Sequence, residues 1–517
     1  MVSNLGAATR APEDGGHDED VPDGPSAPPP LGAGRWAAVV AAMALCGLSA
    51  AMVTLDVGLT PQVIILLGTV VGLTFATIAV SRFWWVVLSL FVVRASLDAL
   101  KLGHYKDGSS TLDPGVIVGL VFLGAGTLWA VAQWRSGAWQ RISATSKWFV
   151  ALAMSALLSA VFSSAPLASG RTALKMCAGA LMFVVLEQYF RSRPERGRAV
   201  LVAAGLSIIV PAIVAFEQLR SPRELEAYLE VSRINGTFVH ANPFATFLVI
   251  VATVSIAVIP HVRGWAKGLA IFAGTAGSVF AFFTYARGAW AALALGLLLI
   301  GIKQDRRIVA ALVAGLLAVI VLVPSFTARL SDLDNAPQTG AGDPNSLSWR
   351  VSYWAELLPL SAQNPITGIG VDQVLATSKV KLQPHSVFVQ SLVETGLVGL
   401  TCLIGLCIAM ARDLARAMRQ APPGLSRGVA IGASAAALGV FTQMFTENLL
   451  TQAAIHWYLA APVVAAIVWS AQGFSAGAPI ERGRSDADDH LDGAETDAEA
   501  DDGIDGSDDD QLSIAPA

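Results

Sequence analysis

Residues 243–260, PFATFLVIVATVSIAVIP, decide the class of fold, because they run for 18 residues without a charged side chain. A helix that crosses the hydrocarbon core of a bilayer needs about 17–25 consecutive, mostly apolar residues. Runs of this kind recur along most of the 517-residue chain, of which only 14% is charged. Soluble domains carry about 25% charged residues. The sequence therefore predicts an all-α integral membrane protein.

Further apolar runs predict about 14 transmembrane helices, within a range of 12–14. They lie at 36–54, 61–80, 83–100, 115–133, 147–163, 172–190, 199–217, 243–260, 265–283, 288–302, 308–324, 388–410, 428–446 and 456–471. The short connections on one side of these segments hold 17 Lys and Arg residues, against 7 on the other side. Because an excess of these residues marks the cytoplasmic side, both termini are predicted to be cytoplasmic.

Charge divides the chain into three regions. Net charge is −4 over residues 1–35 and −12 over 481–517, so the polytopic membrane domain at 36–475 is basic although the whole chain carries −5. The two ends have too few apolar residues to bury a core. This composition predicts disordered cytoplasmic tails at 1–35 and 476–517. A segment that binds a basic partner is the alternative for the acidic end.

Two connections on the outer side hold most of the polar sequence, at 218–242 and 325–387. A connection as long as the second is usually functional or disordered. Short helices are expected inside this large extracytoplasmic loop, because apolar side chains recur at helical spacing at Trp349, Tyr353, Leu357 and Leu360. A helix with this pattern suits the membrane interface, where Trp and Tyr are enriched.

Arg287 lies between two apolar runs. An arginine at membrane depth costs about 2.5–3.5 kcal/mol on insertion scales and normally faces a cavity or a partner; the alternative is a side chain that reaches back to the interface. Arg233 begins RINGTFVHANPFA, with His240 and Asn242 close by. This stretch offers several donors and few acids, which favours an anionic or sugar ligand. Alternatively, Asn242 before Pro243 starts a helix.

Arg350 and His385 are the candidates in the large loop. A guanidinium offers a planar fork of donors that binds phosphate at two points. The alternative for Arg350 is a surface salt bridge with Glu356 or with another acidic residue of the loop. His385 stands in KLQPHSVFVQSLVETG, at the start of an apolar run. Neutral imidazole accepts a proton at neutral pH, which makes His385 a candidate general base. The alternative is a structural histidine at a helix start.

The sequence contains no motif typical of metal binding, nucleotide binding or redox chemistry. The sequence has no HExxH, no CxxC and no Walker motif, and its cysteines, Cys46, Cys177, Cys402 and Cys407, all stand in apolar stretches. No metal and no cofactor are therefore expected. Energy for a synthetic reaction must arrive in an activated substrate.

Four motifs follow one another in a distinctive order. They are RINGTFVHANPFA at 233–245, TYARGAW at 284–290, SWRVSYWAELLPLSAQNPITGIGVDQV at 348–374 and PHSVFVQSLVETGLVGL at 384–400. Together they resemble the O-antigen ligase and O-antigen polymerase superfamily, polytopic glycosyltransferases of bacterial envelopes. The family often has Asn after the histidine, whereas Ser386 stands here.

The resemblance implies a metal-independent glycosyltransferase, polymerase or ligase, in the bacterial cytoplasmic (inner) membrane. Its donor would be a glycan on undecaprenyl diphosphate, and its acceptor a glycan, lipid or protein, in lipopolysaccharide or exopolysaccharide biosynthesis. By motif, Arg287 and Arg350 would clamp the diphosphate, and His385 would be the general base. Arg233 would be a third anion contact, with His240 and Asn242 lining the same mouth.

Two other functions remain open on the sequence. Arginines in a membrane cavity also suit a transporter or flippase for an anionic lipid-linked or small solute, although such proteins often contain internal repeats, and no repeat is visible here. A scaffold whose tails recruit cytoplasmic partners is the third reading. It predicts that function depends on residues 481–517 rather than on the arginines.

Overall fold

A computed structural model of the chain describes residues 82–97, 114–221, 226–228, 231–323, 327 and 347–474. The chain divides into two units, Met1–Ser81 and Arg82–Ala517. The predicted tails at 1–35 and 476–517 lie outside the described residues, as do the predicted spans 36–54 and 61–80 and the loop residues 328–346.

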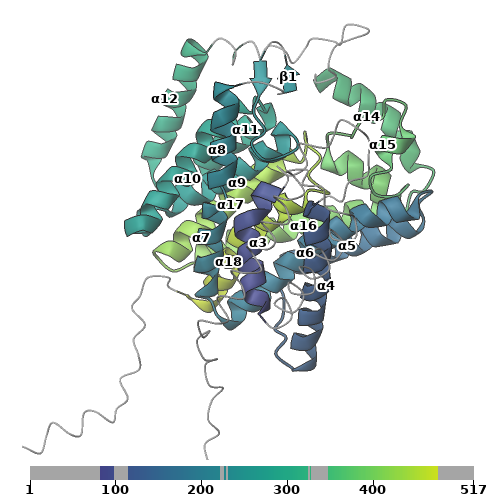
Figure 1. Cartoon of the computed structure of the whole chain (residues 1–517), viewed down its shortest axis with the longest axis horizontal. Coiled ribbons are helices and arrows are strands. Elements are labelled where there is room, and N and C mark those ends of the chain that lie inside the picture. Colours follow the sequence, from purple (N-terminus) through teal and green to yellow (C-terminus); the bar gives the residue numbers. More distant parts are fainter. Residues whose placement is uncertain are drawn as a thin grey trace, which may run out of the picture. The chain divides into compact units, whose positions relative to one another are not determined.

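Helices make up almost all of the described part of the second unit (Figure 1). They are α3 (Phe83–Leu97), α4 (Pro114–Arg135), α5 (Ala144–Val161), α6 (Pro166–Ser192), α7 (Arg196–Leu206), α8 (Ile209–Arg220), α9 (Ala241–Val258), the 3₁₀ turn η2 (Ile259–His261), α10 (Gly264–Phe283), α11 (Arg287–Lys303), α12 (Arg306–Leu322), α14 (Leu347–Ser361), α15 (Val374–Thr377), α16 (Val387–Gln420), α17 (Leu425–Gln443) and α18 (Ala453–Gln472). Strands β1 (Glu226–Tyr228) and β2 (Val231–Arg233) form an antiparallel hairpin that pairs Glu226 with Arg233.

The helices confirm the predicted helical character. Twelve of the predicted apolar segments fall in described residues, and each of them coincides with a helix or, at 199–217, with the pair α7 and α8. Eight described helices are long and apolar enough to cross a membrane. They are Ala144–Val161, Pro166–Ser192, Arg196–Arg220, Ala241–His261, Gly264–Phe283, Val387–Gln420, Leu425–Gln443 and Ala453–Gln472. The chain is a polytopic membrane protein, and its 14 crossings stay a prediction.

Helix α17 lies at the centre of the packing, against α9, α11, α16 and α18. Small residues allow this close approach, since a Cβ built at Gly432 would come within 2.9 Å of the Val254 Cα. Helices in membranes associate through such small side chains, because lipid tails are as apolar as leucine. In contrast, α12 packs against α11, and none of its side chains is buried.

Helix α16 is broken at Gly396, where φ is +67°. A segment of the large loop pairs with the break, as Ile369 N–H donates to the Val393 carbonyl at 3.0 Å and Leu397 N–H donates to the Pro365 carbonyl at 2.9 Å. A Cβ at Gly396 would stand 2.3 Å from the Ile366 carbonyl oxygen. Glycine is therefore required at 396, both for the conformation and for the contact.

Residues Leu347–Ser361 form the helix α14, whose apolar face packs on the protein. Tyr353 and Leu357 are buried with Ile369, Val374 and Val393, beside α15 and α16 (Figure 1). The same helix also holds the chain that leads to His385. Tyr353 OH donates to the Leu382 carbonyl at 2.6 Å, and the Trp354 indole N–H donates to the Pro384 carbonyl at 2.6 Å.

Candidate active site

Arg287 is the first residue of α11 and is half-buried. The turn before it is tight, with Tyr285 at φ +52°. It is braced by Trp290, whose indole N–H donates to the Phe282 carbonyl at 3.0 Å and whose ring stacks on that of Phe282. The N-terminus of a helix carries partial positive charge and binds anions. The position of Arg287 adds a full positive charge to that end.

Arg233 ends β2 and is buried. Its Nε donates to the Thr284 carbonyl at 2.9 Å, and its Nη2 donates to Asn242 Oδ1 at 2.5 Å. One guanidinium thus joins the hairpin, the turn before α11 and the first turn of α9.

Asn242 connects this hydrogen-bond network to a carboxylate. Its Nδ2 donates to Glu447 Oε2 at 2.7 Å. The helix-cap alternative for Asn242 is not what the structure has, because His240 occupies the N-cap of α9 and Asn242 lies inside the first turn. Asn242 is instead a link between Arg233 and Glu447.

Arg350, on α14, donates from Nη1 to the Thr446 carbonyl at 2.9 Å. Gly288, next to Arg287, approaches the same residue, since a Cβ there would stand 2.7 Å from Thr446 Oγ1. Arg350 and Gly288, the residue after Arg287, therefore approach one connection, between α17 and α18.

His385 precedes α16 and adopts φ +52°, a conformation that non-glycine residues seldom take. Asn448 holds it at two points. The His385 backbone N–H donates to Asn448 Oδ1 at 2.7 Å, and Asn448 Nδ2 lies 3.3 Å from His385 Nδ1. Burial lowers the pKa of His385 to about 4, and the positive charge of Arg350 and nearby His240 act in the same direction.

Three consecutive residues, Thr446, Glu447 and Asn448, thus contact three of the predicted site residues. Burial raises the pKa of Glu447 to about 7, while Arg350, Arg233 and the hydrogen bond from Asn242 oppose that shift. These three residues are not among the site residues predicted from the sequence. A feature of the sequence that could have indicated them is the pair Glu447 and Asn448, a carboxylate beside an amide in a short connection between two apolar helices.

The predicted site residues therefore gather around one connection. Arg233 and Asn242 reach it through Glu447, Arg350 through Thr446 and His385 through Asn448. His240 lies within electrostatic range of His385 and is exposed. Arg287 adjoins the connection through its neighbour Gly288.

Residues 269–404 match the family model described as O-antigen ligase, so this segment of the chain is similar to that family. The matched segment includes Arg287, Arg350 and His385, whereas Arg233 and the connection 446–448 lie outside it. No curated protein matches the chain.

Similarity to this family points to a ligase- or polymerase-type function. Together with the apolar helices, it indicates a multi-pass protein of the bacterial inner membrane. Within the described residues, no group of three or more His, Cys, Asp or Glu side chains is placed to hold a metal ion.

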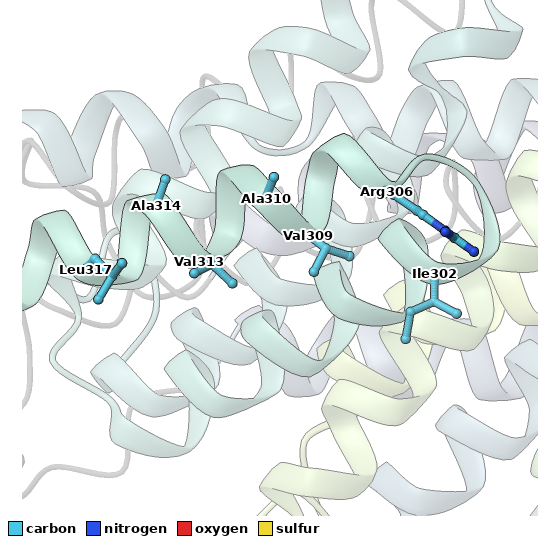
Figure 2. Close-up of a pocket in the computed structure, with 7 residues that line it drawn as sticks. All are labelled: Ile302, Arg306, Val309, Ala310, Val313, Ala314 and Leu317. Atoms are coloured by element: carbon cyan, nitrogen blue, oxygen red, sulfur yellow. The ribbon is translucent and has the colours of Figure 1, made fainter.

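A cavity of 740 Å³ lies apart from this site. Figure 2 shows its lining side chains along α12, with Ile302 near the end of α11 and Arg306 as the polar member. Ile302 lies 15 positions after Arg287, which places them about 22 Å apart along a helix that rises 1.5 Å per residue. A smaller apolar cavity of 60 Å³, lined in part by Val387, Met444 and Leu449, adjoins the site.

Proposed function

We propose that the protein is a glycosyltransferase that transfers or polymerises a glycan from an undecaprenyl-diphosphate-linked donor. The reaction takes place on the extracytoplasmic face, during cell-surface polysaccharide biosynthesis, and both termini lie in the cytoplasm. The observation that carries the proposal is the gathering of Arg233, Arg350 and His385 around residues 446–448, with Arg287 beside it.

The arginines supply what a diphosphate leaving group requires. As the bond to the sugar breaks, negative charge builds on the diphosphate oxygens, and donors already fixed in place stabilise that charge. Arg287 and Arg350 are the clamps, and Arg233 is a third contact. Carbonyl and amide oxygens hold Arg233 and Arg350 in place.

The remaining components serve the lipid and the acceptor. The apolar cavity beside Val387 and Met444 suits an isoprenoid unit rather than a sugar. His385, with His240 and Asn242 near it, faces the reacting groups. His385 is the catalytic side chain of this proposal, and its tautomer decides in which direction it moves a proton.

An assay with purified protein in liposomes and a polyprenyl-diphosphate oligosaccharide tests the proposal. Formation of a new glycosidic bond, read as a ladder of repeat lengths or as transfer to a different acceptor, is the expected result. His385→Ala should remove product while the protein remains in the membrane. Lys379→Ala, an exposed change in the same loop, is the control and should keep activity.

Two results would count against this function. Labelled donor that crosses the liposome membrane without a new glycosidic bond would favour the transporter. Loss of function on deletion of 481–517, with full function in Arg287→Ala and Arg350→Ala, would favour the scaffold.

A further inference from the structure

The orientation of the Asn448 amide determines which nitrogen of His385 carries the proton. A backbone N–H can only donate, so the Asn448 atom 2.7 Å from His385 N must be the oxygen, Oδ1. The amide nitrogen, Nδ2, then faces His385 Nδ1 at 3.3 Å. Since Nδ2 carries hydrogens and is no acceptor, His385 Nδ1 must present its lone pair. Neutral His385 is therefore protonated on Nε2.

This tautomer leaves His385 as a donor toward the substrate. The contacts of His385 with Asn448 use its backbone N–H and Nδ1, and not Nε2. A proton on Nδ1 would be repelled by the hydrogens of the Asn448 amide. Arg350 and His240 also lower the pKa of His385. Transfer of a proton from the hydroxyl of the acceptor substrate to His385 is therefore unfavourable. A different group must take up that proton.

Glu447 is a carboxylate of the same hydrogen-bond network. It shares the connection with Asn448, and its Oε2 accepts from Asn242, which also accepts from Arg233. The charged groups that face Glu447 are Arg233 from β2 and Arg350 from α14. Burial places its pKa at about 7, so that both protonation states are accessible at neutral pH, as general acid–base chemistry requires.

Resting on the proposed transfer reaction, we propose that Asn448 fixes His385 as an Nε2–H donor to the leaving diphosphate and that Glu447 accepts the proton of the acceptor hydroxyl. The hydroxyl oxygen bonds to the anomeric carbon, and its proton passes to the Glu447 carboxylate. The bond from that carbon to the diphosphate oxygen breaks, and its electron pair leaves with the diphosphate. Asn448 is a positioning residue, whereas His385 and Glu447 are catalytic.

The shared arginines couple the two events. Arg233 and Arg350 lower the pKa of Glu447 in the absence of substrate. When a diphosphate binds the same guanidinium groups, its negative charge offsets theirs and raises the pKa of Glu447. Charge that builds on the leaving group therefore makes Glu447 a stronger base as the acceptor hydroxyl loses its proton.

The test compares pH profiles of kcat and kcat/KM for glycan transfer in liposomes. In wild type, kcat/KM should fall on acidification with a midpoint near 7, set by Glu447 in the free enzyme, and kcat should fall with a higher midpoint, since bound diphosphate raises this pKa. Glu447→Gln should remove this limb and lower kcat by about 10²–10⁴-fold, the usual contribution of a general base. His385→Gln, whose amide donates but takes up no proton, should be more active than His385→Ala. Asn448→Ala should lower kcat more than it changes KM.

Ring-nitrogen NMR shifts of labelled histidine, with the His385 signals assigned by their loss in His385→Gln, report the tautomer without any substrate. Protonated Nε2 and bare Nδ1 are expected in wild type. The proposal is overturned by a protonated Nδ1. It is also overturned by an acid limb near pH 4 that disappears in His385→Gln, or by full kcat in Glu447→Gln. Absence of any glycosidic product from wild type would instead refute the transfer reaction itself, and the inference with it.

Discussion

Asn242 and Glu447 are hydrogen-bonded at 2.7 Å although 205 residues separate them in the sequence. Asn242 also accepts from Arg233 at 2.5 Å. The amide therefore stands between a guanidinium and a carboxylate, and orients both. Because a buried polar group that loses its partner costs about 1–3 kcal/mol, this link should matter for stability as well as for activity.

Asn242→Ala tests the link. The change removes an acceptor from Arg233 and a donor from Glu447, and we expect a fall of about 1–3 kcal/mol in the free energy of unfolding together with reduced glycan transfer. Thermal unfolding of the detergent-solubilised protein measures the first effect. Thr442→Ala is the control, because its hydroxyl bonds within α17 alone, to Leu438. Equal melting temperatures for the two variants would contradict the role given to Asn242.

Activity should depend on the shape of the Arg287 and Arg350 side chains as well as on their charge. Arg287→Ala or Arg350→Ala should lower kcat by about 10²–10³-fold, the range found when one preorganised donor to a developing anion is removed. Lysine at either position keeps the charge but loses the fork of donors, so it should restore only part of the activity. Turnover of the lipid-linked donor is the measurement, and Arg412→Ala, an exposed change on α16, should behave as wild type.

Much of the fold could be predicted, because apolar runs of about 20 residues have few alternatives to a helix in a membrane. Even the division of the segment 199–217 had a readable cause. Pro211 has no N–H for the Ser207 carbonyl and crowds it, and α7 ends at Leu206 while α8 begins at Ile209. The break at Gly396 was not predictable in this way, because it depends on pairing with residues 365–370.

In the candidate site, too, some residues could be recognised in the sequence, whereas their partners could not. Arg287, Arg350 and His385 are local oddities, since each is a polar residue beside an apolar run, and their motifs could be recognised in sequence. Nothing local links Asn448 to His385, which lies 63 residues earlier, or Thr446 to Arg350, which lies 96 residues earlier. These pairings arise only when α14, α16 and α17 pack together.

Gly396→Ala should destabilise the protein. A residue with a Cβ at this φ costs about 1–3 kcal/mol in backbone strain, and the contact with the Ile366 carbonyl at 2.3 Å would force the loop away from α16. We expect a lower melting temperature and a lower yield of monodisperse protein in size-exclusion chromatography. Gly315→Ala in α12 is the matched control. A Cβ there meets nothing within 4 Å, and alanine should be neutral or stabilise the helix by about 0.5–1 kcal/mol.

Stability should also depend on pH through Glu447. Its folded pKa of about 7 lies above the ordinary value of 4.5, so the unfolded chain releases this proton first as pH rises. The stability that the protonated carboxyl provides is therefore fully present below pH 4.5 and is lost progressively as the pH rises through 7. Glu447→Gln keeps an uncharged group of the same size and should remove this loss.

The measurement is the melting temperature of wild type and of Glu447→Gln at a series of pH values from 5 to 8, a window that brackets the Glu447 pKa of about 7. The melting temperature of the variant relative to wild type should rise across this range. His385 titrates in the opposite sense. Because its folded pKa of about 4 lies below the ordinary 6.5, its contribution is lost as pH falls from 6.5 through 4, in both proteins alike. A difference between the two proteins that does not change with pH would show that Glu447 is ionised throughout, and would remove the basis for its role as a proton acceptor near neutral pH.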